Sequence, residues 1–407
     1  MASTYLDLAA ADQFLKTIYP DGRPKVGVYK DRPFLAMLKK KENWNGDFLK
    51  LPFRWADGGG GSTQFANAQA NQSAPQTAAF YLVRKKDYAI KTIDNETDMA
   101  SSTDMGAFIS AAEVVIDAAQ NLAAESLSIQ AWGDGVGTRG VIGTIGTVAT
   151  GVIQLTNEDD ITKFDYGMKL NASADSSTVR AVSAWVVGRD EVAGTITVSL
   201  TNGGAAANPS GWTAADILVR DGDLNNVMSG VQSWIPTIVT STDSFFTVNR
   251  SPDTRLRGLY GDLSSKDIQE AMVLGMKYVV RAGGHPDVIL CTYSTYAALE
   301  NSLGAQKRYV EVKGPGDISF TGIELNTRHG SVKVIPDRHC PAKNILILTM
   351  DTWGLYSLGA APKILTYRDG NKFLRVGNAD AAELRIGSYS QVGCAYPGAN
   401  GRFLIAE

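Results

Sequence analysis

The most regular hydrophobic pattern in the chain lies between residues 104 and 131. Apolar side chains recur there at three- and four-residue spacing, at Met105, Phe108, Ile109, Ala112, Ile116, Ala119 and Ala123. This spacing predicts an amphipathic helix, with N-cap candidates at 101–104 and glycine stops at Gly133 and Gly135. At about 1.5 Å per residue such a helix would be roughly 40 Å long, which is long for a globular domain.

A second pattern, between residues 47 and 93, predicts a long β-hairpin. Asp47–Trp55 alternates in part, and Ala79–Ile93 is rich in Tyr, Val and Ile, while the tract between them holds four glycines and many Gln, Asn and Ala residues. A two-stranded hairpin alone is marginal in water, so we expect a neighbouring molecule to support it. Residues 1–46, with three prolines and Lys39-Lys40-Lys41 near the end, predict an extended arm.

The rest of the chain changes character twice. Residues 141–222 hold short β-branched segments separated by turn signals at Asn202-Gly203 and Asp221-Gly222, which predict a small β-barrel or sandwich. Residues 223–360 alternate between helix and strand and predict an α/β layer domain. Its expected elements are a helix capped by Ser264 or Ser265 and ended by Gly283-Gly284, a buried strand at Asp287–Thr292, a helix through Leu303, and strands at Ser331–Ile335 and Asn344–Thr349. Residues 361–407 return to β, with a hairpin expected around 368–371.

Composition narrows the class of protein. The 407 residues carry a net charge of −3, which does not indicate a strongly basic nucleic-acid binder. Residues 101–225 are an acidic island with 15 acidic and 6 basic groups, typical of a separate solvated module. Three widely spaced cysteines argue against a disulfide framework and favour a reducing compartment. We expect neither a cleaved signal peptide nor a membrane span.

Motifs that could carry chemistry are few. Gly135–Gly140 matches G-x-G-x-x-G, but it follows a predicted helix, whereas a dinucleotide site needs it between a strand and a helix. No nucleophile elbow surrounds Cys291, and His339 and Cys340 lack the spacing of a zinc site. The carboxylate cluster Glu158-Asp159-Asp160 lacks the spacing of a calcium loop. The sequence therefore predicts no catalytic residue, no cofactor and no metal site.

The order of the parts and the amino-acid sequences of several segments resemble those of the major capsid proteins of tailed bacteriophages with the Hong Kong 97-type fold. The resemblance covers essentially the whole chain. It is carried by Leu256-Arg257-Gly258-Leu259 before a helix, by His285–Leu290, by Pro336–Pro341 and by Asp351-Thr352-Trp353, together with the arm, long hairpin and long helix before them.

The resemblance implies an α+β fold and a division of the chain. The expected parts are an N-terminal arm (1–46), an extended loop (47–95), a peripheral domain with a spine helix (96–140), an inserted β-rich domain (141–222), an axial domain (223–355), and a peripheral-domain β return with C-terminal strands (356–407). It implies a structural protein without enzymatic activity that forms hexamers and pentamers of an icosahedral shell around double-stranded DNA. The expected partners are the chain itself, a separate scaffolding protein, a portal protein, a possible decoration protein and DNA by non-specific contact, but no membrane. The shell would be assembled in the host cytoplasm and found in the virion.

Contacts between subunits are expected where apolar or basic side chains gather on the arm and the loop. The candidates are Lys39, Lys40, Lys41, Phe48, Phe53, Trp55, Phe80, Tyr81, Arg84, Lys85 and Lys86. Two alternatives stay open. One is a bacterial compartment shell of the encapsulin type, with the same fold and a protein cargo. The other is an α/β enzyme centred on residues 225–355, which the poor inventory of titratable residues argues against.

Overall fold

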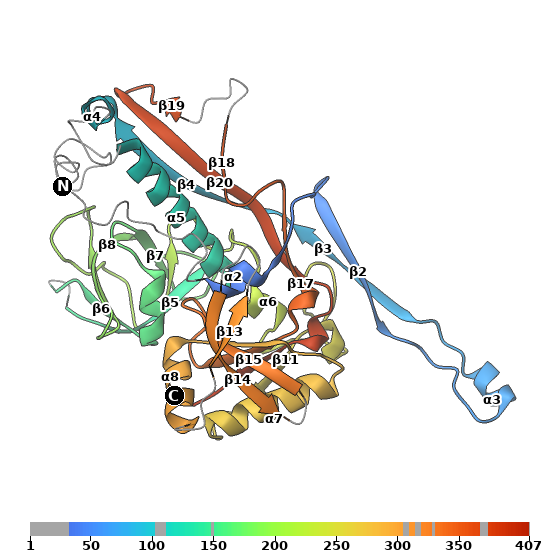
Figure 1. Ribbon diagram of the computed structural model, residues 1–407. Helices are drawn as coiled ribbons and strands as arrows, with labels where there is room; N and C mark the ends of the chain where they lie inside the picture. Colours follow the sequence, from blue (N-terminus) through green and yellow to red (C-terminus); the bar gives the residue numbers. More distant parts are fainter. Residues whose placement is uncertain are drawn as a thin grey trace. The chain divides into compact units, whose positions relative to one another are not determined.

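The computed structural model describes residues 32–101, 111–147, 150–303, 309–313, 319–327, 330–366 and 373–406. These residues form two compact units (Figure 1). The first unit takes the described part of Met1–Ala36 together with Lys85–Ser229 and Ser357–Ser390. The second takes Met37–Arg84, Gly230–Tyr356 and Gln391–Glu407. Each unit is therefore assembled from segments that are distant in the sequence.

In the first unit, a long helix packs on a long antiparallel strand pair (Figure 1). The helix α5 spans Ala111–Trp132, and β4 (Lys85–Asp94) pairs with β20 (Ala381–Cys394) from Asp94↔Ala381 to Lys85↔Ser390. One face of the pair is buried under the helix, because its side chains are small or aliphatic and match those of α5. This core contains Ala89, Ala119, Ala123, Leu384 and Ile386. A shorter helix, α4 (Asn95–Ser101), follows β4.

The predicted long helix is confirmed over Ala111–Trp132, and it ends directly before Gly133. Its expected first residues, up to residue 110, lie outside the described residues. The hairpin expected around 368–371 lies outside the described residues. The short strands β18 (Lys363–Ile364) and β19 (Phe373–Arg375) each pair with β20, because β20 is long enough to offer its second edge to both.

The inserted segment of the first unit closes into a barrel. Its strands follow the order β10-β5-β6-β9-β8-β7. Their bounds are β5 Thr138–Ile145, β6 Val152–Leu155, β7 Lys169–Ser173, β8 Ala184–Asp190, β9 Thr195–Ser199 and β10 Ile217–Arg220, with a 3₁₀ helix at Glu158–Lys163. Phe164 and Leu170 are fully buried among the aliphatic side chains of the interior. Gly135 and Gly137 have φ values of 85° and 98°, so the G-x-G-x-x-G segment is a bend from α5 into β5 and not a strand-to-helix loop.

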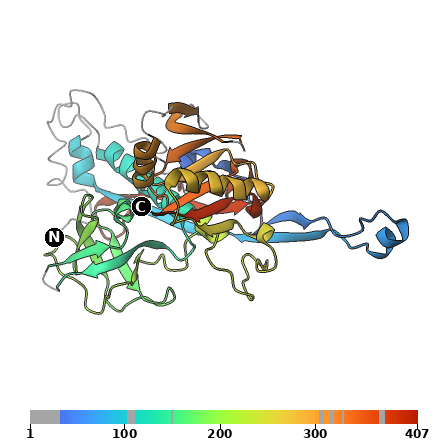
Figure 2. The ribbon, with the colours of Figure 1, turned by 90° about the horizontal axis from the view of Figure 1, so that it is seen from below.

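The second unit is built on a seven-stranded sheet in the order β11-β21-β16-β12-β15-β14-β13. The strands are β11 Leu259–Asp262, β12 Val288–Cys291, β13 Tyr309–Lys313, β14 Ser319–Thr327, β15 Gly330–Pro336, β16 Asn344–Leu348 and β21 Gly401–Leu404. The helices α7 (Ile268–Arg281) and α8 (Tyr293–Leu303) pack on it, and α7 lies along the sheet (Figure 2). Gly275 allows this close approach, because a Cβ there would lie within 3.0 Å of Phe403.

Two details of this unit were not predicted from the sequence. The N-cap of α7 is Asp267 and not Ser264 or Ser265, and Ser264 instead donates its N–H and hydroxyl to Asp262. The strand β21, one of the C-terminal strands expected within 356–407, lies inside the sheet between β11 and β16 and completes the α/β layer. Its alternating Phe403 and Ile405 join the hydrophobic core, which explains the insertion.

Part of the expected arm is folded into the subunit. The short helix α2 (Pro33–Met37) buries Phe34 and Leu35 completely, and Phe34 packs on Trp132 with ring centroids 4.3 Å apart. The strand β1 (Lys39–Lys41) pairs in parallel with β17 (Trp353–Ser357). Residues 33–41 of the expected arm are thus held by their own subunit, and residues 1–31 lie outside the described part. Within the described residues, no helix is long and apolar enough to cross a membrane.

Candidate assembly surfaces

The expected long hairpin consists of β2 (Phe48–Ala56) and β3 (Gln76–Val83), with a short helix, α3 (Phe65–Ala70), at its end (Figure 1). The two strands pair in antiparallel fashion from Phe48↔Val83 to Ala56↔Gln76. The second strand stops at Val83, whereas a single strand was predicted over 79–93. The chain leaves the hairpin at Arg84 and starts β4 in the other unit, because Ala89 and Ile93 alternate toward that unit's cores.

Alternation gives the hairpin two unlike faces. On β2, Phe48, Lys50 and Arg54 are exposed while Phe53 and Trp55 are half-buried. Phe53 stacks on Phe80 of β3, with ring centroids 5.0 Å apart and an interplanar angle of 2°. One face of the hairpin therefore packs within its own subunit, and the other face is exposed to solvent.

The distal part of the hairpin has no core of its own. None of the α3 residues is buried, and Phe65 is 83% exposed. Gly58 and Gly60 have φ values of 83° and 119°, and a Cβ on Gly58 would collide with the carbonyl oxygen of Ser73. Glycine is thus required to turn the chain at the tip, and the tip carries an apolar side chain that the subunit does not cover.

The base of the hairpin is held by an aromatic cluster, which consists of Phe80, Trp234, Phe245 and Phe246. Phe80 and Trp234 have no exposed surface, and Trp234 meets Phe80 edge-on at 4.8 Å and Phe245 at 5.0 Å. Trp234 lies at the end of α6 (Val231–Trp234), and its ring N–H donates to the carbonyl of Val392 over 3.2 Å. Edge-to-face contacts of this kind add about 0.5–1.5 kcal/mol each to the burial of area.

A strained turn completes the base. Phe245 and Val248 exchange two backbone hydrogen bonds of 3.0 Å, while Phe246 and Thr247 between them have φ values of 46° and 71°. Positive φ is unfavourable for bulky and β-branched residues. The turn nevertheless directs the Phe246 carbonyl to the backbone N–H of Tyr81, which donates over 3.2 Å. The loop therefore contributes a main-chain bond to the hairpin.

The basic runs are partly engaged within the subunit. Lys39 pairs with Asp351 at 2.7 Å, with both side chains exposed, and Lys41 donates to the Tyr356 hydroxyl over 3.2 Å. Lys85 donates to the Asn225 carbonyl over 3.0 Å. Arg84 lies over the ring of the buried Trp44 at 5.6 Å, while Lys40 and Lys86 are exposed. Exposed ion pairs are worth about 0–1 kcal/mol, so these lysines can exchange partners at small cost.

The predicted contact residues thus divide into three groups. Phe80 is fully buried, so its predicted place in a contact between subunits is wrong, and it serves the core of its own subunit instead. Phe53 and Trp55 are half-buried, and Trp55 lies under Arg255 at 5.6 Å. Phe48 and Tyr81 are 61% and 38% exposed. For these residues and for the basic runs, a contact with another subunit stays a prediction.

A further apolar surface lies on the β4–β20 pair, on the face away from α5. Tyr88 and Ile90 of β4 are 48% and 51% exposed, and Tyr88 meets Tyr389 of β20 edge-on at 6.0 Å. Neither this surface nor the exposure of Phe65 was predicted from the sequence. The alternation of Lys86, Tyr88 and Ile90 within β4 was the available signal for the first, and a lone aromatic residue in a polar tract was the signal for the second.

Buried charges anchor the barrel to the helix and strand of its unit. Arg220, at the end of β10, donates to Asp87 of β4 over 2.6 Å, to Ser126 of α5 over 3.1 Å and to Asp223 over 2.9 Å. Arg139 lies 3.8 Å from Asp223. Burial lowers the pKa of Arg139 to about 10 and raises the pKa of Asp223 despite Arg220 beside it. Removing one charge of this cluster would therefore leave its partner charged and buried without a counter-ion.

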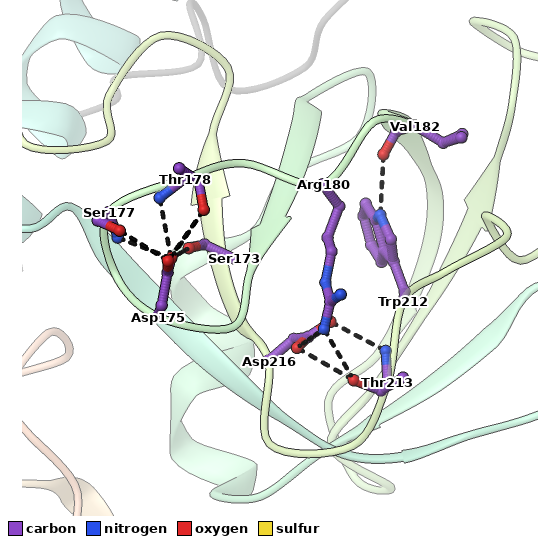
Figure 3. A network of polar contacts seen from close by, with 9 residues as sticks. All are labelled: Ser173, Asp175, Ser177, Thr178, Arg180, Val182, Trp212, Thr213 and Asp216. Carbon is purple, nitrogen blue, oxygen red and sulfur yellow. Dashed lines mark hydrogen bonds and ion pairs between the residues drawn. The ribbon is translucent and has the colours of Figure 1, made fainter.

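The β7–β8 loop of the barrel is organised by Asp175 (Figure 3). Its carboxylate accepts the backbone N–H of Thr178 over 2.9 Å, the backbone N–H of Ser177 over 3.0 Å and both their hydroxyls. These bonds, from Thr178 first and from Ser177, lower the pKa of Asp175. In the same loop, Arg180 forms a two-pronged ion pair with Asp216, with distances of 2.8 and 3.1 Å. The polar groups of this region thus bind one another.

The residues considered for catalysis, and Cys394 with them, are buried in the described part of the chain. Cys291 and Cys394 are fully buried, Cys340 is 2% exposed and His339 is 1% exposed. No group of three or more His, Cys, Asp or Glu side chains among the described residues is placed to hold a metal ion.

Comparison with known proteins finds similarity to phage capsid proteins. Residues 195–373 match the family model described as the SU10 major capsid protein. A search of the curated proteins finds no match. Among solved structures, the capsid of cyanophage A-1(L) superimposes with a TM-score of 0.55 at 11% identity, covering 98% of each chain. The low identity means that this similarity concerns the fold alone.

Two other structures are less similar. The SrpI encapsulin of Synechococcus elongatus has a TM-score of 0.46 at 9% identity, over 98% of this chain and 95% of that one. The capsid of a native GTA particle has a TM-score of 0.48 at 8% identity, over 98% of both chains. Neither similarity is high enough to support an argument.

The predicted α+β capsid fold is confirmed by the cyanophage capsid, whereas the finer division into arm, loop, peripheral, inserted and axial domains stays a prediction. The family match over residues 195–373 covers less than half of the chain, and the shared fold extends the similarity to a phage capsid protein over almost the whole chain.

Proposed function

We propose that this chain assembles as hexamers and pentamers into an icosahedral shell that encloses double-stranded DNA. The observation that carries the proposal is the distal hairpin. It exposes Phe65 by 83% at a tip where no residue of α3 is buried. An isolated hairpin of two strands is marginal in water, so a sequence that maintains one is explained by a neighbouring subunit that covers it.

The energetics of such a shell are favourable without any single strong contact. Burial of apolar surface contributes about 25 cal/mol per Å², before the cost of ordering. The exposed apolar side chains Phe48, Phe65, Tyr88 and Ile90 supply area on two separate surfaces of the chain. Because each subunit repeats these contacts with several neighbours, weak interactions add up to a stable assembly.

The partners follow from this role. A shell of this kind needs a separate scaffolding protein during assembly in the host cytoplasm and a portal protein for DNA entry, and it can carry a decoration protein. The net charge of −3 suits a container, since a strongly basic wall would bind DNA tightly and hinder its release. We propose a purely structural role, with no catalytic activity and no cofactor.

The test is negative-stain electron microscopy of the chain expressed alone and together with its neighbouring genes. Regular shells, tubes or capsomer rings are expected. Phe65→Ser should reduce their yield strongly, because it removes an apolar contact without touching the subunit core. Val192→Ser is the matched control, since Val192 is 91% exposed at a turn of the barrel. This variant should assemble as the parent does.

Two results would contradict the proposal. A monomer or small closed oligomer under both conditions would exclude a shell. Shells that contain a defined protein cargo and no DNA would identify a cargo compartment instead.

A further inference from the structure

The second unit contains a pocket that the shell does not explain. It has a volume of about 440 Å³ and lies between the end of α7 and the strand β11. Its lining includes Leu259, Tyr260, Gly261, Tyr278, Arg281 and Phe403. Its lining thus combines aromatic and aliphatic side chains with polar groups, among them the cation of Arg281.

The pocket owes its depth to Gly261. A Cβ at this position would lie 3.1 Å from the ring of Phe403, so any larger side chain would occupy the space above that ring. Phe403 itself stacks against Tyr278 at 6.1 Å and is 1% exposed. The rings therefore form a rigid floor, over which a side chain of a bound molecule fits.

Beside the pocket runs an open strand edge. β11 is the terminal strand of the sheet in the described part of the chain, paired on one side only, with β21. The amides of Leu259 and Leu263 donate to β21, at Asn400 and Leu404, over 2.8 Å each. Because alternate amides of a strand point in opposite directions, those of Tyr260 and Asp262 point to the open edge. Such an edge is a template for an added strand.

Positive charge stands at the same place. Lys277 and Arg281, both exposed, lie over the ring of Tyr278 at 6.0 and 5.2 Å. Neither has a carboxylate within ion-pair distance among the residues that the structure describes. The one acidic lining residue is Asp262, which already accepts the N–H of Ser264 over 2.9 Å and its hydroxyl over 2.6 Å. Two like charges are thus gathered on one ring without compensation.

We propose that β11 and this pocket bind an extended acidic segment of a partner protein by strand addition. The segment's backbone would pair with the amides of Tyr260 and Asp262. An apolar side chain would enter the space above Phe403, and flanking carboxylates would pair with Lys277 and Arg281. Main-chain bonds supply affinity in this binding mode, and the pocket and charges supply selectivity.

The charges decide between possible occupants. A basic or neutral segment would leave Lys277 and Arg281 uncompensated, and a folded surface could not follow the strand edge into a pocket lined by Gly261. The four residues of β11 match a short segment, so the interaction suits a reversible partner.

The experiment uses the whole chain as an unassembled subunit and measures fluorescence anisotropy of a labelled heptapeptide that alternates Glu and Val around a central Phe. The same peptide with Lys in place of Glu is the charge control. The acidic peptide is expected to bind, with an affinity that falls as salt rises, and the basic peptide is not. Because no shell is required, the result is independent of whether the chain assembles.

Three variants locate the site. Lys277→Gln combined with Arg281→Gln should weaken binding by about tenfold or more, equivalent to about 1.4 kcal/mol. Gly261→Val should abolish it by filling the pocket, with an unchanged circular dichroism spectrum. Lys266→Gln, which removes a cation already paired with Glu270 at 2.9 Å, should bind as the parent does.

Equal binding of both peptides, or an unchanged affinity of Gly261→Val, would overturn the proposal. The proposal would also be overturned if unlabelled chain displaced the peptide and the Gly261→Val chain did not. The pocket would then be an interface between subunits.

Discussion

Arg220 of the barrel and Asp87 of β4 form an ion pair of 2.6 Å in which the Asp87 side chain is 10% exposed and that of Arg220 22%. The pair joins two segments that are 133 residues apart. Ser126 of α5 accepts from the same guanidinium over 3.1 Å. The inserted barrel is thus tied to both elements of the layer from which it emerges, and its position in the first unit depends on charge compensation as well as on packing.

Arg220→Met should lower the free energy of unfolding by about 3–5 kcal/mol, because it leaves the carboxylates of Asp87 and Asp223 buried without their main partner. Urea denaturation monitored by tryptophan fluorescence measures the change. Lys169→Met is the control. It breaks the exposed Lys169–Asp221 pair of 2.9 Å and should cost about 0–1 kcal/mol. Equal losses in the two variants would show that the buried cluster does not anchor the barrel.

The stability of the barrel should depend on pH through Asp175. Hydrogen bonds from Thr178 and Ser177 hold the folded pKa of Asp175 below its ordinary value of 3.8. A depressed pKa means that the carboxylate stabilises the folded state above pH 3.8 and that this contribution fades as the pH falls from there toward the folded pKa.

Asp175→Asn should therefore have a lower urea midpoint than the parent at pH 7, and the difference should shrink when both are measured at pH 3. Asp165→Asn, an exposed carboxylate that accepts the neighbouring Tyr166 N–H over 2.8 Å, serves as the control. A difference for Asp175→Asn that stays constant between the two pH values would contradict the assignment.

The three thiols should be unreactive in the native chain. Cys291, Cys340 and Cys394 are all buried, and burial raises the pKa of Cys394 to about 12. Since the thiolate is the reactive form, a thiol reagent at pH 8 should label almost none of them before unfolding and all three in urea. Rapid labelling of Cys394 in the native state would show that its environment opens.

The turn at the base of the hairpin should be stabilised by glycine. Thr247 is exposed and has a φ of 71°, a conformation that costs a β-branched residue roughly 1 kcal/mol or more. Thr247→Gly should raise the free energy of unfolding by about 0.5–1 kcal/mol. Thr242→Gly, in the same loop but without a positive φ, should lower it, because glycine only adds freedom to the unfolded chain there. The same sign for both would mean that Thr247 is unstrained.

Local patterns were sufficient for most elements of this fold. The three- and four-residue spacing predicted α5 up to its glycine stop, and β-branched runs with Asn-Gly and Asp-Gly turns predicted the strands of the barrel. These features depend on neighbours in sequence, and periodicity reports them directly. The resemblance to tailed-phage capsid proteins added the fold class, which the cyanophage capsid confirms.

The sequence did not predict which strands pair with one another or which faces of them are buried. Ala79–Ile93 reads as one continuous strand, yet Val83 and Lys85 belong to different sheets. Phe80 was expected in a contact between subunits but lies under Trp234, and the C-terminal strand β21, for which no partner was predicted, lies inside the seven-stranded sheet.

The sequence by itself determined which segments are helical, extended or turning, and that no familiar catalytic motif is present. Only the tertiary structure decided which faces of those segments are covered. It buried Phe80, left Phe65 and Tyr88 exposed, and gathered Lys277 and Arg281 on one ring beside an open strand edge. The physical reason is that burial is a property of contacts between residues distant in sequence, and alternation along a strand does not say what lies against either face.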